Sequence, residues 1–154
     1  MNKPSLVNMT ETEFEHYFQD KVARYAAVLA QNALEDSLDF NQKAKEQLHN
    51  LLPDGIHTPN HHLLFINHDD HHVGYIWLKE QQDTKSAFLY EIYLFEEFRN
   101  KGIGSVAMNS VEEWMKEQEL LFLKLHVFGS NTGALKLYEK IGFEVAGINM
   151  MKRV

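Results

Sequence analysis

Two glycines flanked by basic residues stand at a point in the chain where they can hold an anion. The residues are Arg99, Asn100, Lys101, Gly102, Ile103 and Gly104, between an apolar run at 87–95 and a helical pattern at 103–115. Glycine lets the backbone turn sharply and approach a ligand closely. The first N–H groups of a helix have no partner within it, and the helix dipole favours negative charge there. This loop therefore predicts a site for a phosphate or pyrophosphate group.

Composition excludes several classes of protein. A chain of 154 residues is long enough for one domain with its own core, and its formal charge of -7 argues against non-specific binding to nucleic acid. The chain has no cysteine, which excludes disulfides, thiolate nucleophiles and cysteine metal sites. Its N-terminal residues lack the apolar region of a signal peptide, and no apolar run approaches the roughly 20 residues of a membrane span. We expect a soluble, cytoplasmic protein without a membrane partner.

The spacing of apolar residues predicts a mixed α/β fold. It indicates helices at about 11–33 and 40–52, strands at 63–67, 73–79 and 87–95, a helix at 103–115, a strand at 121–128, a short helix at 134–141, and one or two strands at 143–151. The run at 87–95 is almost continuously apolar, which indicates a strand buried on both faces. We therefore expect an antiparallel meander followed by βαβαβ, with helices on both faces of the sheet.

A second pattern follows the glycine loop by one helix and one strand. Residues 131–143 read NTGALKLYEKIGF, and the loop itself has the form Arg-x-x-Gly-x-Gly. In this order the two patterns resemble the signatures of the GNAT superfamily of acetyl-CoA-dependent N-acetyltransferases, over about 63–149. More loosely, the N-terminal helices and the segment LLPDGIHTPNHHL resemble a small bacterial branch of GNAT proteins whose acceptors are mostly unassigned.

The resemblance implies a single GNAT domain over 1–154, in which helices at about 11–52 border the acceptor cleft. It implies that acetyl-CoA is a co-substrate and that the backbone of residues 99–105, from Arg99 to Ser105, holds its pyrophosphate. Tyr93 and Leu94 would pair edge-on with the pantetheine arm, and Asn131 would contact that arm. Tyr138 matches the tyrosine that protonates the departing thiolate.

Acyl transfer to an amine also needs a base, because the attacking amine must be neutral. Imidazole titrates near neutral pH, and His126 lies on the strand face opposite the Leu/Val set, twelve residues before Tyr138. In some GNAT members the matching strand position holds a catalytic glutamate. Glu91 is the alternative base. Phe88 occupies the earlier position at which histone-type members carry a glutamate or histidine, which counts against that arrangement.

Each of these residues also has a purely structural interpretation. Tyr138 fits a core aromatic, His126 a strand histidine bonded to a backbone carbonyl, Asn131 an N-cap alone, and Glu91 a solvated or ion-paired strand residue.

Two further groups of residues leave alternatives open. Lys136 and Lys140, on the polar side of the last predicted helix, are either solvated or able to reach the 3′-phosphate of coenzyme A. Histidines are dense at His57, His61, His62, His68, His71 and His72, but none forms a helical i, i+4 pair with a carboxylate base, and we expect no metal site.

We therefore expect an enzyme that moves an acetyl group from acetyl-CoA directly to a primary amine of a small molecule or peptide. The acidic charge is compatible with a cationic acceptor such as a polyamine, an aminoglycoside or a peptide amine. The alternative is a non-catalytic acyl-CoA-binding sensor. A P-loop nucleotide site is disfavoured, because the loop lacks the Gly-Lys-Ser/Thr ending. The acceptor and the oligomeric state, with a homodimer as one option, stay open.

Overall fold

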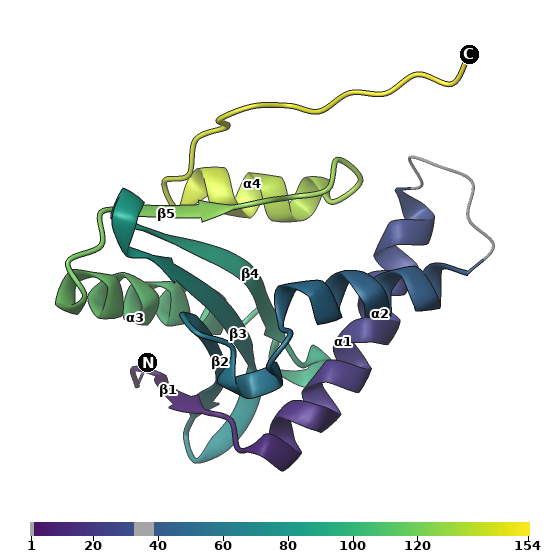
Figure 1. The fold of residues 1–154 in the computed structure, drawn as a ribbon. Coiled ribbons are helices and arrows are strands. Elements are labelled where there is room, and N and C mark those ends of the chain that lie inside the picture. The colour runs from purple at the N-terminus through teal and green to yellow at the C-terminus, as the bar shows by residue number, and fades with distance from the viewer. Residues whose placement is uncertain (1, 33–38) are drawn as a thin grey trace.

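A five-stranded mixed sheet forms the centre of the protein (Figure 1). The computed structural model describes residues 2–32 and 39–154. Strands β1 (Ser5–Asn8), β2 (His61–His68), β3 (His71–Gln81) and β4 (Ser86–Leu94) pair antiparallel in that order. Strand β5 (Phe122–Leu125) pairs with β4 in parallel. An antiparallel meander followed by a parallel crossover confirms the predicted fold class.

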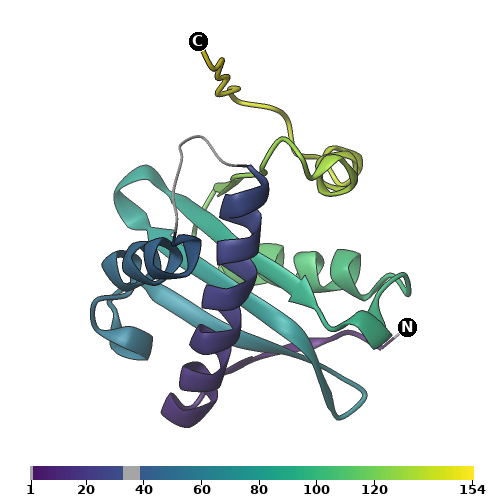
Figure 2. The same cartoon turned by 90° about the vertical axis from the view of Figure 1, so that its right-hand side faces the viewer.

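Helices cover both faces of this sheet. Helices α1 (Glu11–Gln31) and α2 (Phe40–Leu51) lie over one face, and α3 (Ile103–Glu117) lies over the other (Figures 1 and 2). Helix α4 (Thr132–Lys140) follows β5. Helix α1 was predicted to reach residue 33, which lies outside the described residues. Across the described residues, no helix combines the length and apolarity needed to cross a membrane.

Each face of the sheet has its own apolar core. On the α3 side, Ile76 and Leu78 of β3 pack with Ala107 and Val111 of the helix. On the α1 side, the core contains Tyr17, Leu48 and Trp77, among others. The sheet is therefore fixed from both sides, and the strands between the two cores can hold side chains at defined positions.

Three strands differ from the prediction: β1, the end of β5, and the strands predicted at 143–151. Strand β1 was not predicted, because its four residues are too few for a clear alternation of apolar and polar side chains. Strand β5 ends at Leu125 rather than at 128. The strands predicted at 143–151 are wrong: within the described chain these residues form no strand, and they extend away from the sheet after α4 (Figures 1 and 2). An apolar run becomes a strand only when a neighbouring strand satisfies its backbone groups, and the pattern of the run does not specify that neighbour.

Gly74 in β3 gives a test of the register between β3 and β4. A Cβ at this position would lie 2.1 Å from the carbonyl oxygen of Tyr93, which is backbone and cannot rotate away. We expect Gly74→Ala to lower the free energy of unfolding by about 1–3 kcal/mol, measured by urea unfolding. Gly133→Ala is the matched control. Nothing lies within 4 Å of its added Cβ, and alanine favours the helix, so its stability should not fall.

Candidate active site

Strands β4 and β5 pair only at one end and then separate (Figure 1). Their register runs from Ser86 opposite Phe122 to Leu89 opposite Leu125 and stops there. Strand β4 continues to Leu94, and beyond Leu89 no strand of the described chain pairs with this edge. The separation leaves an open strand edge inside the molecule.

A β-bulge lies where the separation begins. Trp77 of β3 is paired with Glu91, whereas the next residue, Leu78, is paired with Leu89. Tyr90 is therefore the extra residue on β4. A bulge changes the faces to which the following side chains point. Tyr90 and Glu91 consequently both face the helix α1 side, although they are neighbours in sequence.

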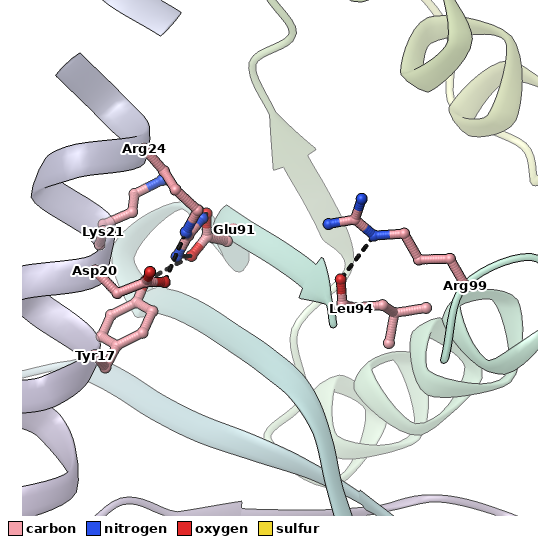
Figure 3. Close-up of polar contacts among 7 residues, drawn as sticks. All are labelled: Tyr17, Asp20, Lys21, Arg24, Glu91, Leu94 and Arg99. Carbon is pink, nitrogen blue, oxygen red and sulfur yellow. Dashed lines mark hydrogen bonds and ion pairs between the residues drawn. The ribbon is translucent and has the colours of Figure 1, made fainter. Parts of the chain in front are cut away.

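The backbone beyond the bulge alternates between β3 and the open edge. The Phe95 N–H donates to the Val73 carbonyl at 2.9 Å, so Phe95 is bonded to β3 and Leu94 faces the open edge. The Arg99 Nε donates to the Leu94 carbonyl at 2.8 Å (Figure 3). The carbonyl of Tyr93 instead lies against β3 at Gly74. The open edge therefore offers the backbone of Leu94 rather than that of Tyr93.

The glycine loop has the backbone shape of an anion site. Asn100 has φ 61° and Gly102 has φ 80°, both in the left-handed region. Gly102 is the N-cap residue of α3, and no described side chain caps this end of the helix. The first turn of α3 contains no acidic residue. The N–H groups of this turn are therefore available to a negatively charged group.

Glu91 is held by three side chains of helix α1 (Figure 3). The Tyr17 hydroxyl donates to Oε1 at 2.9 Å, and Lys21 Nζ donates to Oε2 at 2.9 Å. The Arg24 guanidinium donates from Nη1 to Oε2 at 2.7 Å and from Nη2 to Oε1 at 3.1 Å. The Glu91 side chain is only 8% exposed. This cluster fixes α1 against the part of β4 that β5 no longer covers.

The cluster also fixes protonation states. Burial raises the pKa of the Glu91 carboxyl, but the hydrogen bonds and charges of Arg24 and Lys21 outweigh burial, and the net pKa lies below its ordinary value. Burial and the neighbouring Glu91 raise the pKa of Tyr17 well above its ordinary value. Near neutral pH, Glu91 is therefore a carboxylate and Tyr17 a neutral phenol.

One cavity brings together the three residues predicted to be catalytic. It has a volume of about 600 Å³, and Glu91, His126, Asn131 and Tyr138 are among its lining residues. It extends from the separated strands to helix α1, where its lining residues include Lys21, Arg24 and Tyr25. The separation of β4 and β5 thus coincides with the cavity.

Helix α4 supplies Asn131 and Tyr138 to this cavity. Asn131 is the N-cap, and its Oδ1 accepts from the Ala134 N–H at 3.2 Å. The Tyr138 ring packs edge-on against Phe143, with ring centroids 5.5 Å apart. Burial, followed by the charge of Glu91, raises the pKa of Tyr138. The Tyr138 hydroxyl therefore keeps its proton at neutral pH.

Other predicted residues lie outside the cavity lining. Lys136 and Lys140 are exposed on α4, and the loop at 99–105 lies at the start of α3. The clustered histidines have separate partners: His57 contacts Glu11, and His62 lies 2.7 Å from Glu80. Among the residues that the structure describes, no group of three or more histidine or acidic side chains is arranged to hold a metal ion.

Sequence reasoning assigned no role to Lys21 or Arg24, the two cations that bind Glu91. A spacing of four and then three residues places Tyr17, Lys21 and Arg24 on one face of a helix, a face that also carries the aromatic residues of the core. A lysine and an arginine on an apolar helix face were the available signal. Such cations need a buried carboxylate as a partner, and the sequence does not show that Glu91 supplies it.

The mixed sheet, with its opening between two parallel strands and an uncapped glycine loop at the start of α3, matches the fold of an acetyltransferase. Residues 12–143 match the model of the acetyltransferase (GNAT) family. The chain therefore belongs to the GNAT family, and it is an acetyltransferase.

Two relatives support this assignment over nearly all of the chain, and a more distant structure shares the fold. It is 31% identical to the N-acetyltransferase YdgE of Bacillus subtilis, described as uncharacterized, with 97% of this chain and 98% of YdgE covered. The crystal structure of the Bacillus subtilis acetyltransferase YycN has a TM-score of 0.91 at 31% identity and covers 98% of each chain. The PaiA N-acetyltransferase of Thermoplasma acidophilum, in complex with coenzyme A, has a TM-score of 0.67 at 22% identity, covering 96% of this chain and 94% of PaiA.

The buried carboxylate of Glu91 predicts a specific dependence of stability on pH. Its pKa is lowered in the folded protein, so it stabilises the fold above the ordinary glutamate pKa of about 4.3, and this contribution is lost as pH falls through the lowered pKa. We expect Glu91→Gln to reduce the free energy of unfolding at pH 7 by about 3 kcal/mol, because Lys21 and Arg24 lose their partner. Urea unfolding from pH 7 to pH 3 should show this difference shrinking.

The matched control is Glu113→Gln, which removes an exposed ion pair with Lys3. Its effect at pH 7 should stay within about 0.5 kcal/mol. A deficit in Glu91→Gln that remained constant down to pH 3 would contradict the ionised cluster.

Proposed function

We propose that this protein transfers the acetyl group of acetyl-CoA directly to a primary amine of a small molecule or peptide. The observation that carries the proposal is the single cavity in which Tyr138, Asn131 and His126 meet at the open edge of β4. The proposal needs no covalent enzyme intermediate, in agreement with a chain that has no cysteine.

Residues on both sides of the opening fit the donor. The uncapped turn of α3, with Arg99, Asn100, Lys101, Gly102, Ile103, Gly104 and Ser105, fits the pyrophosphate of coenzyme A. The edge at Leu94, beside Tyr93, fits the amides of the pantetheine arm, once the Arg99 side chain leaves the Leu94 carbonyl. Asn131 would contact the same arm while it caps α4, and Lys140 would reach the 3′-phosphate.

Tyr138 is the proposed acid. In the reaction the amine nitrogen forms a bond to the acetyl carbon, the bond from that carbon to sulfur breaks, and the electron pair stays on sulfur. Tyr138 then donates its hydroxyl proton to the sulfur. A phenol whose pKa is raised by burial and by Glu91 arrives at this step protonated, which is what a general acid requires.

His126 is the proposed base, and Glu91 is less suited. Both line the cavity, but the two Glu91 oxygens already accept four hydrogen bonds from Tyr17, Lys21 and Arg24. A carboxylate offers about four acceptor sites, so Glu91 has none left for the proton of an amine or a water. His126 is exposed and can take that proton directly or through water.

The test of the function is a screen for acetyl-CoA consumption over a library of primary amines. Thiol release should depend on an added amine and should yield the acetylated amine by mass spectrometry. Binding of acetyl-CoA without turnover on amino acids, peptides, polyamines and aminoglycosides would favour a sensor module instead.

Replacement of Tyr138 tests the acid. We expect Tyr138→Phe to lower kcat by about 10²-fold or more, because the thiolate then leaves without a proton donor. The affinity for coenzyme A, measured by calorimetry, should stay nearly unchanged, since the ring and its packing on Phe143 remain. An unchanged kcat would remove Tyr138 from the mechanism.

Replacement of His126 tests the base. We expect His126→Gln to lower kcat at neutral pH by about 10²-fold. Raising the pH should recover much of that loss, because a larger share of the amine is then neutral without help from the enzyme. A pH profile parallel to that of the wild type would assign the base elsewhere.

A further inference from the structure

The cavity beside helix α1 contains side-chain hydrogen-bond donors that are free to bind a ligand, but no free carboxylate acceptor. Glu91 is the only carboxylate among the described residues that line it, and four hydrogen bonds from α1 occupy its two oxygens. Asp20 is not a lining residue; its side chain is 48% exposed, and it bonds Arg24 at Nε. A substrate ammonium group would therefore find no free carboxylate in this part of the cavity.

Lys21 and Arg24 each have N–H donors that their bonds to Glu91 and Asp20 do not use. An ammonium group has three N–H donors, and Lys21 directs one of them to Glu91. A guanidinium group has five, and the bonds of Arg24 to Glu91 and Asp20 engage three. Both side chains line the cavity, with only 13% and 21% of their surface exposed. Partly desolvated donors of this kind suit an anionic oxygen on a ligand.

The remaining wall is apolar and aromatic. Tyr25, Trp77, Phe88, Tyr90 and Phe128 line the cavity. The Trp77 and Tyr90 rings stack with centroids 4.5 Å apart, and Phe88 tilts against Tyr90 at 4.7 Å. A wall of packed rings favours a hydrocarbon or aromatic body over a flexible chain of charged amines.

We propose that the acceptor is a monoamine that carries a carboxylate beside an apolar or aromatic body, as an apolar α-amino acid does. This inference rests on the proposed function and names the substrate class of that site. Lys21 and Arg24 would hold the carboxylate, the aromatic wall would hold the side chain, and the amine would face the opening between β4 and β5. Polyamines and aminoglycosides would be poor acceptors, because the cavity offers no free carboxylate to their additional charges.

The test compares matched acceptors on the full chain. Phenylalanine and leucine are paired with phenethylamine and isoamylamine, which lack the carboxylate, and spermidine represents the polyamines. We expect kcat/KM to be about tenfold or more higher for each amino acid than for its decarboxylated partner, and spermidine to react at background. Phenylalaninamide separates a carboxylate from a peptide-like carbonyl, and it should behave like phenethylamine.

Lys21 variants locate the effect. Lys21→Met should lower the ratio of kcat/KM for phenylalanine to kcat/KM for phenethylamine about tenfold, and Lys21→Arg should retain most of that ratio. A fold defect would instead lower kcat/KM for both amines alike and leave the ratio unchanged.

The outcomes separate this inference from the proposed function. Preferred turnover of spermidine, or equal turnover of phenylalanine and phenethylamine, overturns the acceptor class and leaves acetyl transfer standing. Calorimetry that detects no binding of acetyl-CoA overturns both. Acetyl-CoA binding without acetylation of any of these amines also overturns the acceptor class.

Discussion

The bulge at Tyr90 determines how the rest of the site is arranged. In a regular strand Glu91 would face the α3 core together with Leu89, because side chains alternate. The extra residue instead places Glu91 on the α1 side and returns Ile92 and Leu94 to the α3 side. The carboxylate can then bind the cations of α1. Strand β4 is thereby held by its two faces at the point where β5 no longer supports its edge.

Separation of β4 and β5 would be costly without that support, since open strand edges expose unpaired backbone groups. The Glu91 cluster and the ring of Tyr93 pack against the unpaired part of β4 from the α1 side. The Arg24 guanidinium lies 4.0 Å from the centre of the Tyr93 ring, and that of Arg99 lies 5.0 Å from it. One tyrosine therefore contacts a cation from α1 and a cation from the glycine loop. The Tyr93 ring therefore links helix α1 to the glycine loop.

The glycine loop and the N-cap of α4 could be read from the sequence, whereas the bulge in β4 and the Glu91 cluster could not, for a physical reason. The glycine loop and the N-cap Asn131 act through local backbone geometry, which leaves a readable pattern of residue types. The prediction that β4 is buried on both faces is wrong beyond Leu89, where residues 90–92 line the cavity and residues 93 and 94 are only half-buried. A bulge depends on pairing with β3 and leaves no local signal. The two cations on α1 indicate that a buried carboxylate is needed, but they do not show which residue, far along the chain, supplies it.

The net charge of the protein and the charges inside the cavity favour different classes of acceptor. A formal charge of -7 is compatible with a cationic acceptor, yet the carboxylate inside the cavity is already satisfied by Lys21 and Arg24. The field of a whole protein acts on the rate of encounter, whereas discrimination depends on the groups that a ligand touches after it loses water. The proposed donor contacts lie largely on backbone, which many sequences can supply. The proposed acceptor contacts lie on side chains of α1, where a few substitutions would change the chemistry of the cavity. A GNAT fold shared with PaiA at 22% identity is therefore compatible with a different acceptor.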